Sequence, residues 1–208
     1  MKALFINGSP RPNGCTKRGL QELEKVLKDE GIDVEWLEIG SKDIRGCISC
    51  YYCRTHNKCV FNDLVNESAP KLAECDALVV GTPVYYAGPN GQLHSFLDRL
   101  FFSTAACIDK TMKVGATVVS SRRAGSTSAF DDINKYFTIS AMPIASSTYW
   151  NEVHGFTRED VEKDLEGLQT MRNLGRNLAF LLKAIKALKD KEGVPQQERG
   201  AWTNFIEG

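Results

Sequence analysis

Five short apolar segments, separated by stretches of helical character, constrain the fold of this chain more than any other feature. Each segment has the length of a strand, and most end at glycine, proline or hydroxyl residues that interrupt regular structure. Alternating strands and helices predict a parallel sheet with helices on both faces. The strands are expected at 3–7, 33–39, 76–80, 113–120 and 143–149, and the helices at 17–30, 63–74, 91–102, 128–139 and 157–188, the last broken near Gly167.

The composition fits a single domain and argues against several classes of partner. A chain of 208 residues has the usual size of one α/β domain. Its 26 Lys and Arg residues balance 26 Asp and Glu residues, so no net charge attracts nucleic acid or an anionic membrane. No apolar run reaches the roughly 18 residues of a membrane helix, and the N-terminus has no signal-peptide cleavage site. We therefore expect a cytoplasmic protein without a nucleic-acid or membrane partner.

One domain is expected over residues 1–190, with a cysteine-rich loop at 44–62. The tail at 191–208 is polar and has Trp202 and Phe205 as isolated apolar residues. These two side chains are expected to anchor the tail, either on their own chain or at an interface between copies.

The loop after the first strand has the residues of an anion site. Small and hydroxyl residues fill the segment 8–16, so backbone N–H groups and side-chain oxygens can converge on one ligand. The start of the next helix adds partial positive charge, and Arg11 and Lys17 add full charges. The alternative is an ordinary turn into a helix that Thr16 caps. A P-loop needs lysine where Cys15 stands, and the dinucleotide motif G-x-G-x-x-G is absent, so the loop favours the phosphate of a mononucleotide.

Four of the seven cysteines, Cys47, Cys50, Cys53 and Cys59, fall within thirteen residues. Two-residue gaps let three thiolates curl round one centre, and a fourth just beyond can close the cage, as in [4Fe–4S] ligation. Zinc sites usually have two CxxC pairs with a longer arm between them. Zinc, redox-active or incidental thiols and a disulfide remain alternatives.

Two further loops follow strands and are candidates for a ligand site, because parallel sheets bind ligands at the carboxyl ends of their strands. The loop at 81–88 combines glycine and proline, which fix backbone amides, with two adjacent tyrosines; the alternative is a turn with packed tyrosines. The loop at 120–126 places two adjacent arginines among small residues, where they can either neutralise an electron-rich ligand or face solvent.

Together these motifs resemble the NAD(P)H-dependent FMN reductase and iron–sulfur flavoprotein branch of the flavodoxin-like superfamily. The resemblance runs over nearly the whole chain, through the segment 8–16, the cysteine loop, the string GTPVYYAG at 81–88, the two-arginine loop and the tail. It implies a flavodoxin-like three-layer α/β/α sandwich with a five-stranded parallel sheet of order 2-1-3-4-5. It also implies FMN as cofactor and a homodimer or homotetramer.

The resemblance assigns each loop to one part of FMN, and assigns the cysteine loop to a [4Fe–4S] cluster. Related flavoproteins without a cluster retain several of these cysteines, so the cluster is a separate expectation. The resemblance also extends the flavin site to Trp150 and Asn151, in the segment after the expected fifth strand. The implied residues are Ser9, Arg11, Asn13, Gly14, Cys15 and Thr16 at the phosphate; Thr82, Pro83, Val84, Tyr85, Tyr86, Ala87 and Gly88 along the isoalloxazine ring; Ser121, Arg122, Arg123 and Gly125 at its pyrimidine side; and Cys47, Cys50, Cys53 and Cys59 at the cluster.

The expected function is an oxidoreductase in which NAD(P)H reduces FMN and the electrons pass to a quinone, a flavin, a nitro compound or a protein. No catalytic side chain is expected, because the flavin supplies the chemistry. The alternatives are a non-enzymatic electron carrier with FMN and a cluster, and a binding protein that has lost its cofactor. In the first two cases FMN is expected beside a second redox centre.

The remaining polar side chains are expected to be structural. His56 could ligate a metal, and His94 or His154 could meet a substrate, but a surface position is favoured for all three. The other assignments are a helix-face charge network for Asp98 and Arg99, and small core positions for Cys75 and Cys107.

Overall fold

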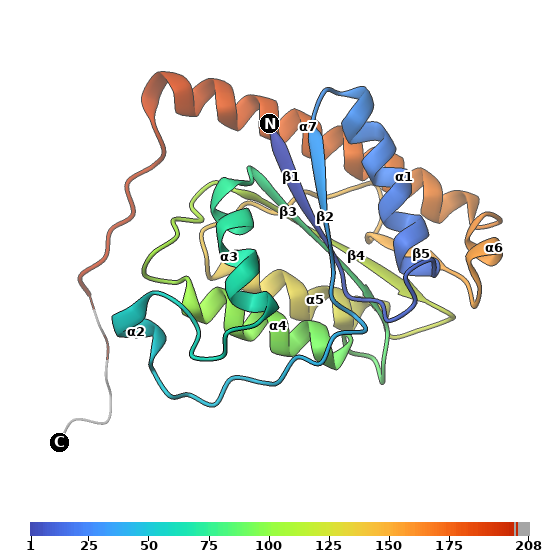
Figure 1. The fold of residues 1–208 in the computed structure, drawn as a ribbon. Helices are drawn as coiled ribbons and strands as arrows, with labels where there is room; N and C mark the ends of the chain where they lie inside the picture. Colours follow the sequence, from blue (N-terminus) through green and yellow to red (C-terminus); the bar gives the residue numbers. More distant parts are fainter. Residues whose placement is uncertain (202, 204–208) are drawn as a thin grey trace.

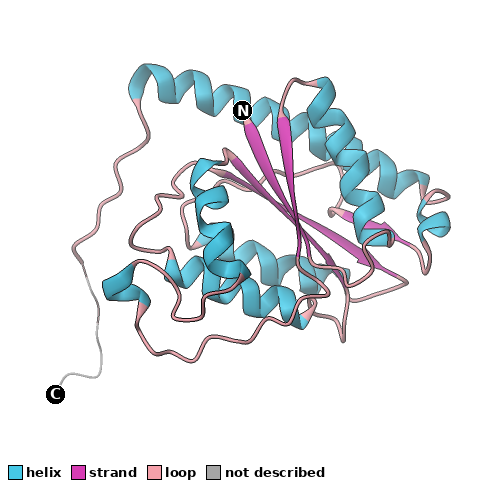
Figure 2. Cartoon of the chain, in the orientation of Figure 1, coloured by secondary structure: helices cyan, strands magenta, loops and turns pink. Residues whose placement is uncertain are grey.

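The computed structural model describes residues 1–201 and 203 and contains a five-stranded parallel sheet (Figures 1 and 2). The strand order is β2-β1-β3-β4-β5, which confirms the predicted fold class. The strands are β1 (Lys2–Asn7), β2 (Asp33–Glu38), β3 (Ala77–Pro83), β4 (Val114–Ser121) and β5 (Glu152–His154).

Helices cover both faces of the sheet and complete the three layers (Figure 1). Side chains of α1 and α7 pack on one face, and side chains of α3, α4 and α5 pack on the other. Of the two short helices, α2 has no buried residue, whereas α6 adds Val161 to the core under α1 and α7. The helices are α1 (Cys15–Asp29), α2 (Cys53–His56), α3 (Leu64–Glu74), α4 (Gly91–Ser103), α5 (Ser126–Thr138), α6 (Arg158–Val161) and α7 (Leu165–Glu192).

The interior strand β1 shows why the apolar runs have no alternation. Ala3 and Phe5 join the core under α1 and α7, whereas Leu4 and Ile6 join the core under α3, α4 and α5. All four side chains are fully buried. A strand that is covered on both faces needs apolar residues at every position, which is the pattern of the sequence.

The predicted fifth strand is wrong, because β5 is Glu152–His154 rather than 143–149. Backbone bonds tie Pro143 and Ala145 to Gly115 at the start of β4, and the only bridge there is isolated. The chain then leaves the sheet, since Ser147 Oγ donates to the Thr170 carbonyl of α7 at 2.7 Å. A bond to a helix thus replaces the strand pairing that the apolar pattern suggests.

The long C-terminal helical stretch is interrupted before Gly167, at residues 162–164 between α6 and α7. Thr157 closes a capping box at the start of α6, and the Asp164 carboxylate accepts the Gly167 N–H at 2.9 Å at the start of α7. Side-chain caps of this kind begin new helices, so the break follows the caps and not the glycine.

No helix in the described part of the chain combines the length and the apolar character needed to cross a bilayer. The segment 194–201 has neither helix nor strand. The two expected anchors of the tail, Trp202 and Phe205, lie outside the described residues.

Candidate functional site

Loops after β1, β3, β4 and β5 converge on a cleft of about 160 Å³ at the carboxyl edge of the sheet. This is the edge at which parallel sheets bind their ligands. The lining residues are Ser9, Arg11, Gly14, Cys15, Thr16, Pro83, Val84, Tyr85, Ser120, Ser121, Arg122, Gly155 and Phe156.

The first of these loops is held in shape by its own polar side chains. Asn7 Oδ1 accepts the Ser9 N–H at 3.1 Å, and Ser9 Oγ accepts the Arg11 N–H at 3.2 Å. The buried hydroxyl of Thr16 bonds to that of Ser120 at 2.7 Å and ties the start of α1 to the end of β4. The N-cap of α1 is Gly14, so no side chain caps the helix and Thr16 does not serve as its cap. An uncapped helix start with hydroxyl groups and Arg11 beside it suits an anion.

The loop after β3 is a strained hairpin. Tyr85 and Gly88 exchange two backbone hydrogen bonds, of 2.8 and 3.0 Å. The two residues between them, Tyr86 and Ala87, both have positive φ, of 50° and 61°. Such two-residue turns favour Asn-Gly, and each non-glycine residue in this region costs about 1–3 kcal/mol. A strained turn at the mouth of a cleft is typical of a ligand-binding loop.

The loop after β4 packs directly against this hairpin at Gly125. Its φ is +88°, and a Cβ atom built there would lie 2.9 Å from Ala87 Cα. Only glycine fits both the conformation and the space. Arg122, which precedes Gly125 in the same loop, is exposed and lines the cleft. The contact at Gly125 therefore fixes the positions of the two loops relative to each other.

The structure brings most of the expected FMN residues to the cleft and leaves others outside its lining. Among the latter, Thr82 is fully buried, and its hydroxyl accepts the Asn90 N–H at 3.0 Å inside the loop. Of the two arginines, Arg122 lines the cleft and Arg123 does not. The expected residues outside the lining are Asn13, Thr82, Tyr86, Ala87, Gly88, Arg123 and Gly125.

Three lining residues were not among the predicted site residues: Ser120, which lies in the loop predicted at 120–126, and Gly155 and Phe156, which lie outside the predicted loops. Gly155 and Phe156 were missed because the fifth strand was placed too early. The Cys15 thiol donates to the Gly155 carbonyl at 3.4 Å, and burial raises its pKa. The expected pair before them, Trp150 and Asn151, precedes β5 instead of following it: Trp150 is half exposed and Asn151 is buried.

A second pocket gathers all four clustered cysteines, Cys47, Cys50, Cys53 and Cys59. All seven cysteines are free, so the disulfide alternative does not hold in this structure. Burial, and then the neighbouring thiols, raise the pKa of Cys53. The other walls of the pocket are mostly apolar and include Ile48, Val60, Phe61, Phe102 and, as a cation, Arg99.

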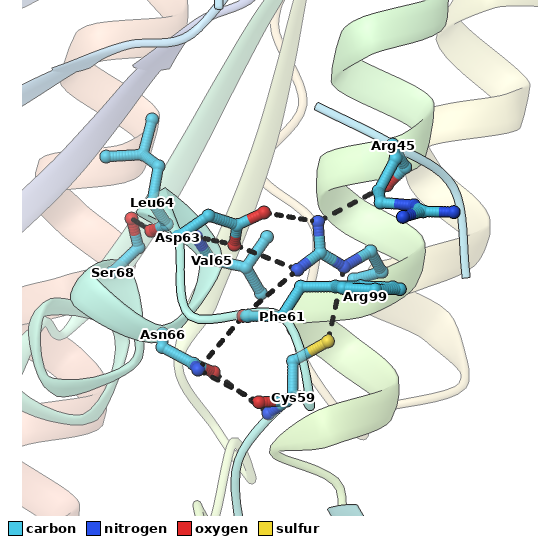
Figure 3. A network of polar contacts seen from close by, with 9 residues as sticks. All are labelled: Arg45, Cys59, Phe61, Asp63, Leu64, Val65, Asn66, Ser68 and Arg99. Carbon is cyan, nitrogen blue, oxygen red and sulfur yellow. Dashed lines mark hydrogen bonds and ion pairs between the residues drawn. The ribbon is translucent and has the colours of Figure 1, made fainter. Parts of the chain in front are cut away.

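The backbone of the cysteine loop turns sharply at Cys50. Ser49 and Tyr51, on either side of Cys50, have positive φ values of 53° and 57°. Asn66 clamps the last cysteine, because its amide accepts the Cys59 N–H at 2.9 Å and donates to the Cys59 carbonyl at 3.0 Å (Figure 3). The loop is therefore shaped by bonds that need no metal.

Among the described residues, no group of three or more His, Cys, Asp or Glu side chains is arranged to hold a single metal ion. A cubane cluster takes one thiolate at each of its irons, so its four ligands stand farther apart than those of one zinc ion. Four thiols round one small, largely apolar pocket are a donor set that suits such a cluster.

The two pockets share no lining residue. The cysteine pocket lies by α2 and the C-terminal half of α4, whereas the loop after β4 lies at the opposite side of the view in Figure 1. The described chain thus forms two separate pockets, and the adjacency of the two redox centres stays a prediction.

Several other expectations need correction. Arg99 is 1% exposed and pairs with Asp63, so it is not part of a helix-face network; Asp98 bonds instead to the Tyr136 hydroxyl. Cys75 is buried as expected, but Cys107 is exposed.

The histidines divide between the surface and the interior. His56 is exposed and stacks on Tyr52, with the ring centroids 3.7 Å apart. His94 has a buried Nε2 atom without a partner among the described residues. His154 lies in β5, with Nδ1 3.0 Å from Ser121 Oγ, so it reaches a residue of the cleft.

The fold and the cleft define a flavodoxin-like α/β protein whose ligand site lies at the carboxyl edge of its sheet. The solved structure of RosB with a bound flavin intermediate covers the whole chain with a TM-score of 0.70 at 14% identity and 94% coverage of that chain. An archaeal flavodoxin covers 88% of this chain and 99% of its own, with a TM-score of 0.57 at 18% identity.

The chain belongs to the NADPH-dependent FMN reductase family, whose profile matches residues 1–156. It is 32% identical to an iron–sulfur flavoprotein of Methanocaldococcus jannaschii over 89% of this chain and 100% of the relative. It is 27% identical to an iron–sulfur flavoprotein of Methanosarcina thermophila over 92% of this chain and 100% of that protein.

Proposed function

We propose that this chain is an FMN-dependent oxidoreductase that accepts a hydride from NAD(P)H and passes the electrons to a quinone, a flavin, a nitro compound or a protein. One observation carries the proposal: the loops after β1, β3 and β4 form one cleft with an uncapped helix start at one end. Membership in the FMN reductase family supports it.

The cleft residues suit the two ends of FMN. Ser9, Arg11 and Thr16 would hold the phosphate at the start of α1, where backbone N–H groups and a positive charge meet. Val84 and Tyr85 would lie along the flat ring, and Arg122 would stabilise negative charge on the reduced pyrimidine. When bound, FMN supplies hydride and single-electron chemistry, while these residues position it and set its electrostatics.

A second function, an electron carrier with FMN and a [4Fe–4S] cluster, is favoured by the cysteine pocket. Its four thiols share one small pocket, and the relatives compared above bear the name iron–sulfur flavoprotein. Cys47, Cys50, Cys53 and Cys59 would be the ligands. The two proposals differ in whether NAD(P)H reduces the flavin directly.

Anaerobic stopped-flow mixing with NADPH and NADH tests the oxidoreductase. We expect the flavin band at about 450 nm to bleach within the turnover time of the enzyme. If neither nicotinamide bleaches the band while dithionite does, the protein binds FMN but is not an NAD(P)H oxidoreductase, and the carrier remains.

Iron and acid-labile sulfide analysis of protein purified without oxygen tests the cluster. We expect one [4Fe–4S] cluster per chain, its loss in Cys50→Ser, and its retention in the matched control Cys107→Ser, which removes an exposed thiol outside the pocket. Iron and sulfide well below one cluster per wild-type chain would exclude the carrier with a cluster.

A homodimer or homotetramer and a cytoplasmic location complete the proposal. Sedimentation of the FMN-loaded protein tests the first, since a monomer at micromolar concentration would contradict it. Fractionation of the source cells tests the second.

A further inference from the structure

Arg99 is the largest fully buried side chain of the described residues and lines the cysteine pocket. It comes from the second half of α4 and is 1% exposed. A buried guanidinium is costly unless every donor is used and its charge is paired. The residues that receive its five N–H groups therefore show what the side chain is positioned for.

Four of the five N–H groups bind oxygen atoms and close the base of the cysteine loop (Figure 3). Asp63 accepts two bonds in a fork, at 2.7 Å and 2.8 Å, and pairs the charge. The carbonyls of Arg45 and Phe61, at the two ends of the loop, accept the others at 3.3 and 3.4 Å. Asp63 in turn caps α3 by accepting the Val65 N–H at 3.1 Å, so the guanidinium has a fixed orientation.

The fifth N–H, on Nε, donates to Cys59 Sγ at 3.3 Å. Asn66 fixes the Cys59 backbone through its N–H and carbonyl groups. The sulfur is the one acceptor in this network that belongs to a clustered cysteine. The Nε contact therefore satisfies the last buried donor and also joins the guanidinium to the cysteine site.

We propose that Arg99 is a positioning residue that raises the reduction potential of a [4Fe–4S] cluster bound by the four cysteines, through its Nε–H bond to Cys59 Sγ and its buried charge. The inference rests on the cluster of the proposed function. Hydrogen bonds to cluster sulfurs, burial and net charge are the means by which proteins set such potentials.

The redox step that Arg99 affects is a simple one-electron uptake. A cluster held by the four cysteines would take up one electron from the flavin or, in the test, from dithionite; no bond would form or break and no proton would move. The site would gain one unit of negative charge, and a cation held against a ligand sulfur in a largely apolar pocket favours that state.

Potentiometry followed by EPR of the reduced cluster, at one pH, tests the proposal on the full-length protein. Arg99→Gln should shift the one-electron equilibrium at least tenfold toward the oxidised cluster, which is about 59 mV lower in potential. Arg99→Lys, which keeps the charge but not the fork, should lie between Arg99→Gln and the wild type. The control Arg172→Gln removes an arginine that pairs with Glu22 on the α1–α7 face and should leave the potential unchanged. A wild-type potential in Arg99→Gln would overturn the proposal.

A measurement on the unmutated protein decides the matter if the variants do not assemble a cluster. In protein labelled with ¹⁵N only at arginine, pulsed EPR of the reduced cluster should detect a ¹⁵N hyperfine coupling from Nε. If the cluster is present and this coupling is absent, the proposed role of Arg99 is wrong and the cluster proposal still stands. Wild-type protein without iron and sulfide would instead overturn the cluster, and with it both proposals.

Discussion

Cys75 and Cys107 have similar neighbours in the sequence but differ in burial in the folded chain. The Cys75 thiol is 1% exposed, donates to the Leu72 carbonyl at 3.4 Å, and has its pKa raised by burial from 9.0 to about 11. Cys107 ends up exposed although it too adjoins apolar residues. The side chains that bury a thiol come from distant parts of the chain, so local sequence cannot tell a buried cysteine from an exposed one. The predicted core position is therefore correct for Cys75 and wrong for Cys107.

Because burial raises the pKa of the Cys75 thiol, we expect the protein to lose stability at alkaline pH. The unfolded chain releases the thiol proton at lower pH than the folded chain does. The contribution of the protonated thiol to the free energy of unfolding is therefore complete below pH 9 and is lost as pH rises from 9 toward 11. Between about pH 8 and about pH 10.5 the wild type should lose roughly 2 kcal/mol more free energy of unfolding than Cys75→Ala. Urea unfolding at both pH values measures this, with Cys107→Ala as the control that should behave like the wild type. Equal losses in Cys75→Ala and the wild type would contradict the prediction.

At the scale of elements, close approaches decide which packing the helices and loops adopt. Gly175 of α7 lies against Val26 of α1, where an added Cβ atom would be 2.8 Å from Val26 Cβ. Gly125 likewise lets the loops after β3 and β4 touch. Neither glycine has a local sequence signal, because the atom that excludes a side chain belongs to another element.

Gly175→Ala should destabilise the protein by about 1–3 kcal/mol, although alanine is the better helix former by roughly 1 kcal/mol. The reason is the clash with Val26 across the α1–α7 contact. In the Val26→Gly background, which removes the clashing Cβ atom, the same substitution should be neutral or stabilising. A double-mutant cycle from urea unfolding measures the coupling, and additive effects would show that the helices do not meet there.

Gly125→Ala should weaken FMN binding roughly tenfold, equal to about 1.4 kcal/mol, because it strains a positive-φ residue and pushes the loop away from Ala87. Gly91→Ala is the matched control, since a Cβ atom there meets nothing within 4 Å. Fluorescence titration of FMN gives both affinities. Equal affinity in the two variants would mean that the loop contact does not shape the flavin site.

At the scale of the whole molecule, the cleft joins segments that begin at residue 9 and end at residue 156, so a ligand that fills it links most of the fold. Anything that binds only the folded state stabilises it by mass action. The flavin should therefore act as a global stabiliser and not only as a local one.

FMN at about 100 times its Kd should add roughly 2.7 kcal/mol, a rise in Tm of about 5–10 °C. Riboflavin, which lacks the phosphate, should raise Tm far less, and Arg11→Ala should narrow the difference between the two. Differential scanning fluorimetry of the apoprotein measures all three. Equal shifts with FMN and riboflavin would show that the segment 8–16 does not bind the phosphate.

The sequence by itself determined the layers and the loops where the cleft forms, because buried parallel strands need unbroken apolar runs and their carboxyl ends meet at one edge. The strand order followed only from the resemblance to flavodoxin-like proteins. It also determined that four cysteines share one loop. Only the tertiary structure placed β5 at Glu152–His154 and brought Gly155 and Phe156 into the cleft.

The cysteine loop shows the same division most clearly. Its spacing alone predicts a shared site, but no pattern marks Arg99, forty residues beyond Cys59, as the cation aimed at its sulfur. Because Arg99 directly follows Asp98 in α4, the sequence suggests a charged pair on the helix surface. The true position of Arg99 depends on Asp63 and two carbonyls supplied by the folded loop, since a buried charge is stable only where other segments pair it.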